Sequence, residues 1–213
     1  MYKSNMIHHW PFNGNFRDHS GDSDLIEGEN FELTNDRFNN EKSALCLNNG
    51  YLKLPTRVYF ADNDFSVLAW VRIKKFNEWS RLLEVGNNEN ENDTISFLLS
   101  YETTGRPMIR MHFHNIKILE HVSSKSLEKN KWQHLSFVLK YPLSYIYIDS
   151  ELTSVGSSTG LPRNIPRTCN FIGKSNLKCM NGLDHNANVD IDDLKIFNKS
   201  LNQNEIKIEM NFG

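Results

Sequence analysis

The chain has 213 residues and a mass of 24.8 kDa, which suits one large all-β domain. Hydrophobic residues make up 38% of it and include 13 Phe, 7 Tyr and 4 Trp, enough to fill one sizeable core, so global disorder is excluded. The net charge is −2 and the basic residues are scattered, so neither nucleic acid nor an anionic membrane surface is an expected partner. No apolar run is long enough to predict a membrane span.

Period-two alternation of apolar and polar residues dominates the chain and predicts strands. In FSVLAWVRI (65–73), for example, every second side chain from Phe65 to Ile73 points to one face. In chain order, strands are predicted at 6–12, 30–34, 43–47, 50–55, 65–73, 80–86, 94–101, 108–114, 133–140, 144–150, 169–173 and 189–197.

Turn signals such as HSGDSD, LNNG and TTGRP separate these strands, and the connections are too short for the crossovers of a parallel sheet. The chain is therefore predicted to be all-β, an antiparallel β-sandwich in a single domain over residues 1–213. Near the end, Asn202 and Glu205 form a capping-box pattern before Ile206, which predicts a short C-terminal helix.

The N-terminus and the cysteines leave the cellular compartment open. The opening segment MYKSNMIHHWPF has no apolar stretch and no small-residue cleavage site, so no signal peptide is predicted. The three cysteines, Cys46, Cys169 and Cys179, are too few for a disulfide scaffold. Cys169 and Cys179 would close a short loop in an oxidising compartment. Two free thiols are the alternative, and both interpretations stay open.

The stretch NVDIDDLKIFNKSLNQNEI (188–206) places Asp190, Asp192 and Asp193 in an otherwise apolar strand. In a regular strand, Asp190 and Asp192 share one face and Asp193 lies on the other. Carboxylates are costly inside a sheet unless something neutralises them. Three interpretations follow: catalytic acids, metal ligands, or solvated and hydrogen-bonded groups.

Eight landmarks follow one another in a recognisable order. They are HHWPFNGNFRDHSG, KSALCLNNGYLKLP, NDFSVLAWVRI, WSRLLEVG, KWQHLSFVLK, YIYIDSEL, CNFIGKS and VDIDDLKIFNKSLNQNEI. In this order they resemble the laminin-G-like jelly roll of the concanavalin A-like lectin/glucanase superfamily, over nearly the whole chain. The resemblance implies two curved antiparallel sheets packed face to face, binding of glycans or proteins, and often a structural calcium at the sandwich edge.

The sequence departs from this family at two places. The family commonly has Asp-Gly after its YI-x-(apolar) motif, where this chain has Asp149 and Ser150. Serine tolerates positive φ less well than glycine, which leaves the conformation of this turn open. The family also tends to have Gly before IDD, where this chain has Val189 and Asp190.

A calcium site is expected where the two ends of the chain meet. Calcium takes six to eight oxygen ligands, which aspartates, carbonyls and water can supply. The resemblance points to Asp18 in DHSG as a partner, since the first and last strands of a sandwich are often neighbours. The predicted metal ligands are Asp18, Asp192 and Asp193, with carbonyls of the 13–15 or 20–21 turns completing the shell. The alternative, aspartates that bind no metal, stays open.

Catalysis is the least favoured interpretation. Retaining glycosidases need two carboxylates about 5–5.5 Å apart, which the superfamily's glucanases supply as alternating Glu and Asp on one strand. The segment 189–197 has no Glu, EVGNNENEN (84–92) runs into an Asn-rich loop, and EGENFE (27–32) lacks an aspartate between its glutamates. No catalytic residue is therefore predicted.

Aromatic and histidine side chains are the candidates for ligand binding. Sugar rings stack on aromatic faces through their apolar C–H groups. Of the four tryptophans, Trp10, Trp70 and Trp132 are assigned to the core, and Trp79 is left as a candidate for ligand binding. His112 and His114 are two apart on a predicted strand, a spacing that suits zinc but lacks further ligands nearby, so a polar sheet face is preferred. The candidate ligand-binding residues are Trp79, Tyr101, His112, His114, Tyr145 and Tyr147.

Together these features favour a non-catalytic recognition domain that binds a carbohydrate or a protein surface through rim loops and one sheet face, with a structural calcium. The alternative is a structural jelly-roll subunit of a larger assembly, such as a particle surface, a fibre or a cell-surface array. A glycoside hydrolase is the third hypothesis. The resemblance favours an extracellular or particle-surface location.

Overall fold

The computed structural model describes residues 5–25, 27–87, 93–114, 116–176 and 185–212. Within these residues the elements are β1 (Met6–Trp10), β2 (Glu27–Thr34), β3 (Ala44–Lys53), β4 (Phe65–Ile73), β5 (Arg81–Gly86), β6 (Thr94–Leu98), β7 (Met108–Phe113), β8 (Ile116–Val122), β9 (Trp132–Lys140), β10 (Leu143–Ile148), β11 (Glu151–Ser157), β12 (Cys169–Ile172), β13 (Ala187–Phe197) and α1 (Gln203–Asn211).

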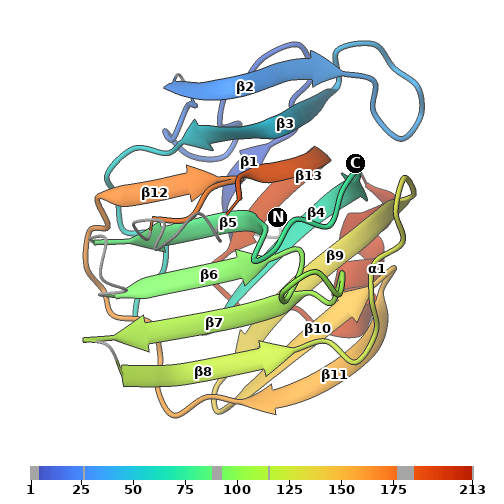
Figure 1. Cartoon of the computed structure of the whole chain (residues 1–213). Coiled ribbons are helices and arrows are strands. Elements are labelled where there is room, and N and C mark those ends of the chain that lie inside the picture. Colours follow the sequence, from blue (N-terminus) through green and yellow to red (C-terminus); the bar gives the residue numbers. More distant parts are fainter. Residues whose placement is uncertain (1–4, 26, 88–92, 115, 177–184, 213) are drawn as a thin grey trace.

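The strands form two layers that face each other (Figure 1). One layer contains β12, β5, β6, β7 and β8; the other contains β13, β4, β9, β10 and β11, and β3 joins β13 to β12 in the hydrogen-bonded order. Every pairing between these strands is antiparallel. The predicted antiparallel sandwich with a jelly-roll arrangement is confirmed.

The far edges of the two layers are linked by a histidine. His121 on β8 shares one hydrogen bond of 2.8 Å with Ser154 on β11 and another of 2.8 Å with Ser144 on β10. Burial lowers the pKa of His121 to about 4, so the ring is neutral at physiological pH.

The core lies between the layers and follows the predicted alternation. In β4 the side chains of Phe65, Val67 and the following alternate positions to Ile73 are buried in the main cluster. Phenylalanines from both layers meet at its centre, where the ring centroids of Phe97 and Phe137 are 5.4 Å apart. Burial of this apolar surface is the main force that holds the two layers together.

The predicted strands 43–47 and 50–55 are one continuous strand, β3, so the LNNG turn prediction is wrong. Asn49 has φ +49, and the register with β2 shifts between Glu29 and Phe31, so a bulge absorbs the irregularity. Strands β8 and β11 were not predicted, because their exposed edge positions weaken the apolar alternation.

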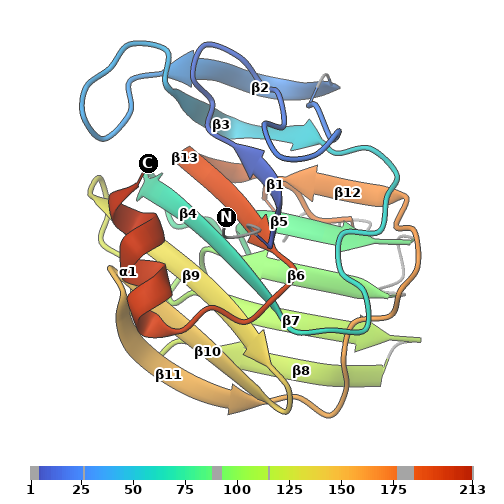
Figure 2. The same ribbon diagram turned by 180° about the vertical axis from the view of Figure 1, so that it is seen from behind.

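Helix α1 lies on the outer face of the layer that contains β4, β9 and β10 (Figure 2). It closes a second apolar cluster formed by Leu68, Val138, Tyr147, Phe197, Leu201 and Ile206. The predicted capping box is confirmed, since the Asn202 side chain accepts from Glu205 N at 3.0 Å and Asn202 N donates to the Glu205 carboxylate at 2.8 Å. No helix in the described part of the chain is long and apolar enough to cross a membrane.

The turn between β10 and β11 has two left-handed residues, with φ +52 at Asp149 and +63 at Ser150. Two positive φ values are typical of the type I′ hairpin turn, which matches the twist of the flanking strands. A residue outside the turn holds Asp149 in place, because Asp149 Oδ1 accepts a 2.8 Å hydrogen bond from His134 N on β9. The turn therefore has a conformation that favours glycine although a serine occupies it.

Candidate functional site

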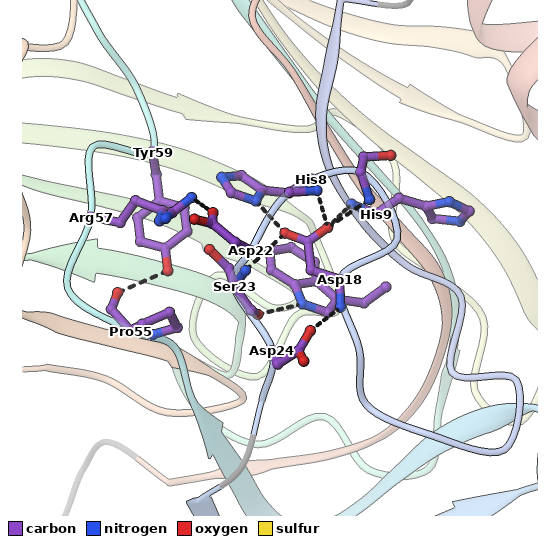
Figure 3. A network of polar contacts seen from close by, with 12 residues as sticks. His8, His9, Asp18, Asp22, Ser23, Asp24, Pro55, Arg57 and Tyr59 are labelled. Carbon is purple, nitrogen blue, oxygen red and sulfur yellow. Dashed lines mark hydrogen bonds and ion pairs between the residues drawn. The ribbon is translucent and has the colours of Figure 1, made fainter.

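Asp18 is the centre of a polar network between β1 and the loop that follows it (Figure 3). Its Oδ2 lies 2.5 Å from His8 Nδ1. The carboxylate also accepts hydrogen bonds of 2.9 to 3.3 Å from the backbone N–H groups of His9, Ser20, Gly21 and Ser23. Burial would raise the pKa of Asp18, but the hydrogen bonds from His8 and the backbone outweigh it and hold the pKa well below its usual range. Asp18 is therefore an anion surrounded by N–H donors.

The glycine of DHSG is required by this close approach. A Cβ on Gly21 would lie 2.6 Å from Asp18 Oδ2 and 2.8 Å from the carbonyl oxygen of Ile7. A second contact joins this loop to β1, because Trp10 Nε1 donates to the Ser23 carbonyl at 2.9 Å. The network thus attaches loop 18–24 to the first strand.

The first and last strands are neighbours, as expected, since β1 pairs with β13 and His9 lies opposite Lys195. The ring of His9 is hydrogen-bonded to Asp193, with 2.8 Å between Nε2 and Oδ1, while the backbone N–H of His9 donates to Asp18. Asp18 and Asp193 are therefore linked through one histidine residue.

The predicted alternation of Asp192 and Asp193 across β13 is wrong. Asp193 has φ +50, and the register with β4 shifts between Asp192 and Lys195. This bulge turns both carboxylates toward Arg37, which contacts Asp192 through Nη1 and Asp193 through Nη2 at 3.3 Å. Strand periodicity gives no sign of a bulge, and Arg37 lies far away in the sequence.

The proximity of the two carboxylates separates their pKa values. Burial and the charge of Asp193 raise the pKa of Asp192 to about 7, against the opposing effect of Arg37. Burial would also raise the pKa of Asp193, but its hydrogen bond with His9 and the charge of Lys195 lower it. Two like charges this close favour ionisation of only one of them.

Asp190 is fully buried on the same strand and has its own partners. Arg72 Nη2 lies 2.8 Å from its Oδ2, and Lys74 Nζ lies 2.5 Å from its Oδ1. Each of the three aspartates of β13 is thus in contact with a basic side chain from another segment.

These residues do not fit a calcium site as they are placed. Calcium needs several oxygen ligands directed at one point, whereas the oxygens of Asp18 face N–H donors and Asp192 faces a guanidinium. Nowhere in the described ranges do three or more His, Cys, Asp or Glu side chains group around a metal position. Calcium remains a prediction from the family resemblance.

Two of the three tryptophans assigned to the core lie outside it. Trp10 is fully buried in the main cluster. Trp70 and Trp132 are half-buried on the outer face, where Arg37 and Arg72 lie over their rings at 4.8 and 5.0 Å from the centroids. Cation–π contacts shield these rings in place of core packing. The alternation of 65–73 was the available signal, because it sets Trp70 opposite the core face.

Of the predicted ligand-binding residues, Trp79 and Tyr101 are brought together. Their rings meet edge to face with centroids 5.1 Å apart, in the loops that follow β4 and β6. His112 and His114 do not share a strand face, contrary to the prediction, because β7 ends at Phe113 and His114 has φ +46. His114 Nε2 instead lies 3.1 Å from Arg163 Nη1, a cationic neighbour that disfavours a metal ion.

Tyr145 and Tyr147 line a cavity of about 310 Å³ between β9, β10 and the start of α1. Their rings are stacked with centroids 6.4 Å apart and planes at 25°. The other lining residues, which sequence reasoning missed, are Val138, Lys140, Ser200, Leu201, Asn202, Gln203 and Glu205. They come from β9, from the segment between β13 and α1, and from the first turn of α1, and the approach of these parts leaves no local sequence signal.

Glu84 on β5 was also missed, although the alternation of RLLEVG sets it on the face opposite the core. It is fully buried and accepts hydrogen bonds from Arg81 Nε at 3.0 Å, Ser96 Oγ at 2.7 Å and Asn176 N at 2.6 Å. Burial would raise its pKa, but the charge of Arg81 and these donors lower it. Glu84 is therefore a buried anion held by donors from three other residues.

Two antiparallel layers with a closing strand beside the first strand define the jelly-roll class of β-sandwiches. The model of the Concanavalin A-like lectin/glucanases superfamily matches residues 47–207, and the chain belongs to this superfamily. A search of curated protein sequences found no match.

Solved structures with this fold include carbohydrate-binding and toxin domains. Domain 4 of AbnA, a GH43 extracellular arabinanase from Geobacillus stearothermophilus in complex with arabinotriose, superposes with a TM-score of 0.72 at 17% identity, covering 97% of this chain and 98% of that one. The botulinum neurotoxin serotype D/C VPI 5993 binding domain gives 0.74 at 19% identity, covering 98% of this chain and 52% of that one.

A further structure is the binding domain of botulinum neurotoxin DC in complex with rat synaptotagmin II, with a TM-score of 0.67 at 16% identity, covering 98% of this chain and 51% of that one. The chain therefore spans about half the length of the toxin binding domains. At these identities the likeness shows the fold alone.

Proposed function

We propose that this chain is a non-catalytic recognition domain that binds carbohydrate in the cavity between β9, β10 and α1. The observation that carries the proposal is the stacked pair Tyr145 and Tyr147, which lines a cavity of about 310 Å³ together with polar side chains. Ligand sites in proteins are typically concave, about 300–1,000 Å³ in volume, and combine aromatic surface with a few polar groups. The arabinotriose complex of the AbnA domain supports carbohydrate as the ligand class.

Exposed apolar side chains of β11 extend the surface formed by the rings of Tyr145 and Tyr147. Tyr145 lies opposite Val155 and Tyr147 opposite Leu152 in the β10–β11 pairing, and Val155 and Leu152 are exposed. The apolar C–H face of a sugar chain longer than the cavity would rest on this strip, with its hydroxyl groups in water.

Calorimetric titration of the chain with a panel of neutral and acidic oligosaccharides tests the proposal. We expect Tyr145→Ala to weaken binding about tenfold, which corresponds to about 1.4 kcal/mol. Tyr147→Phe is expected to bind like the wild type, because it keeps the ring that packs against α1.

Trp79→Ala is the matched control, since Trp79 and Tyr101 form the rival aromatic pair. Loss of binding in Trp79→Ala with normal binding in Tyr145→Ala would move the site to the rim loops. Absence of binding to every oligosaccharide would refute the carbohydrate proposal.

A protein surface is the second candidate ligand. The exposed apolar side chains Leu143, Leu152 and Val155 lie together on β10 and β11 beside the cavity. The synaptotagmin complex of a toxin domain with this fold supports this class of partner. The remaining alternative, a structural subunit of a larger assembly, predicts self-association, so a stable monomer in sedimentation at high concentration would argue against it.

A further inference from the structure

We infer that the sugar bound in the Tyr145–Tyr147 cavity carries an anionic group, a carboxylate or a sulfate ester, and that Lys140 binds this group. The inference rests on the proposed function, because it names the class of carbohydrate that the same cavity takes. Two charged side chains line the cavity, Lys140 and Glu205, and the inference depends on which of them already has a partner.

Lys140 is the unpaired charge of the cavity. It ends β9, its side chain is exposed, and it lines the cavity beside Tyr145. In the described part of the chain its amine has no hydrogen bond and no ion pair. A cation in this position is free to bind a ligand at no cost in broken internal contacts.

The carboxylate that lines the cavity is already neutralised. Glu205 lies 2.7 Å from Lys199 Nζ and accepts a 2.8 Å hydrogen bond from Asn202 N. Burial would raise its pKa, but Lys199 and the Asn202 N–H lower it, so Glu205 stays ionised within its own ion pair. It therefore does not compete for the amine of Lys140.

The remaining polar lining groups are also partly engaged. Ser200 Oγ donates to Asp64 at 3.1 Å, and Gln203 Nε2 donates to the Ser150 carbonyl at 3.0 Å. Asp64 itself accepts a second hydrogen bond, from Tyr141 N at 2.9 Å, and does not line the cavity. Among the described residues, the donors of the cavity that remain for a ligand are the charged Lys140 amine and, as neutral groups, the side-chain amide N–H groups of Asn202 and the hydroxyl group of Tyr145. This donor set suits an anionic sugar that also stacks on an aromatic ring.

Calorimetric titration with trigalacturonate, its methyl ester, galactotriose and sulfated galactotriose tests the inference. The methyl ester keeps the shape of the acid and removes its charge. We expect the wild type to bind trigalacturonate or sulfated galactotriose about tenfold more tightly than the neutral counterpart, and this preference to decrease at high salt. Whichever of the two anionic ligands binds more tightly identifies the anionic group as a carboxylate or a sulfate ester.

Lys140→Gln is expected to bind the acidic and neutral ligands equally, at the affinity of the neutral ones. Lys207→Gln is the matched control, since Lys207 is an exposed lysine of α1 that does not line the cavity. It is expected to keep the wild-type preference.

Equal affinity of the wild type for acidic and neutral ligands would overturn the inference, as would an unchanged preference in Lys140→Gln. Binding of neutral sugars that disappears in Tyr145→Ala would then leave the proposed function intact. Failure of all four ligands to bind would overturn the inference and count against the proposed function as well.

Discussion

At the scale of single residues, Asp18 and the three aspartates of β13 are buried and have partners of different kinds. Backbone N–H groups and His8 surround Asp18, Arg72 and Lys74 neutralise Asp190, and Arg37 bridges Asp192 and Asp193. Removing one partner of a buried charged group leaves the other uncompensated, which is costly. These contacts explain how carboxylates are tolerated in an otherwise apolar strand.

The raised pKa of Asp192 predicts a pH dependence of stability. Its value of about 7 in the folded protein exceeds the ordinary value near 4, so the folded state binds more protons than the unfolded state between these pH values. Stability contributed by the protonated group is present below pH 4 and is lost as the pH rises toward 7.

Asp192→Asn should therefore gain stability relative to the wild type between pH 5 and pH 8, by at least about 1 kcal/mol. Arg37 keeps Asp193 as a partner in this variant. Urea unfolding of both proteins across this range measures the difference. A difference that does not change with pH would show that Asp192 is ionised throughout.

At the scale of elements, the hairpin turn between β10 and β11 holds two consecutive non-glycine residues, Asp149 and Ser150, in the left-handed region. A non-glycine residue in the left-handed region costs about 1–2 kcal/mol, and glycine avoids this cost while losing more entropy on folding. We expect Ser150→Gly to raise the free energy of unfolding by about 0.5–1 kcal/mol, measured by urea unfolding.

Ser157→Gly is the control for this prediction, since Ser157 lies in β11 without a positive φ. Glycine inside a strand is expected to lower stability by about 0.5–1 kcal/mol. A loss of stability in both variants would mean that the Ser150 side chain contributes more than its backbone strain costs.

At the scale of the whole molecule, the contacts of Asp18 and Asp193 with His9 fasten the N-terminal segment to the closing strand. A calcium ion bound to the folded state alone would raise stability by about 2.7 kcal/mol at a hundredfold excess over its dissociation constant. Since N–H donors already occupy the Asp18 oxygens, we expect the same melting temperature in calcium and in chelator. A higher melting temperature in calcium would show that the folded chain binds this ion, contrary to our expectation.

The same experiment includes Asp18→Asn, which we expect to lower the free energy of unfolding by about 2–4 kcal/mol at pH 7, because hydrogen bonds to a buried charge are lost. Asp22→Asn is its control, because Asp22 is 73% exposed in its ion pair with Arg57. The expected change there is below about 1 kcal/mol. The depressed pKa of Asp18 implies that the difference between wild type and Asp18→Asn decreases below pH 4.

The layered fold was predictable because its signals are local. Alternation placed Phe65 and its partners in the core, short connections required antiparallel pairing, and Asn202 with Glu205 marked the helix start. The site was predictable only in part. Tyr145 and Tyr147, which line the proposed site, were among the predicted residues. Lys140 and the residues at the start of α1 were not, since no sequence spacing records where α1 docks on the sheet.

The sequence by itself determined the antiparallel sandwich and the core face of each regular strand. These depend on periodicity and turn chemistry within a few residues. Tertiary structure alone decided the partners of the charges. Arg37 reaches Asp192 from a distant loop, and a bulge turns Asp193 to the same side. Long-range pairs and bulges depend on how strands meet in space, and period-two alternation carries no record of that.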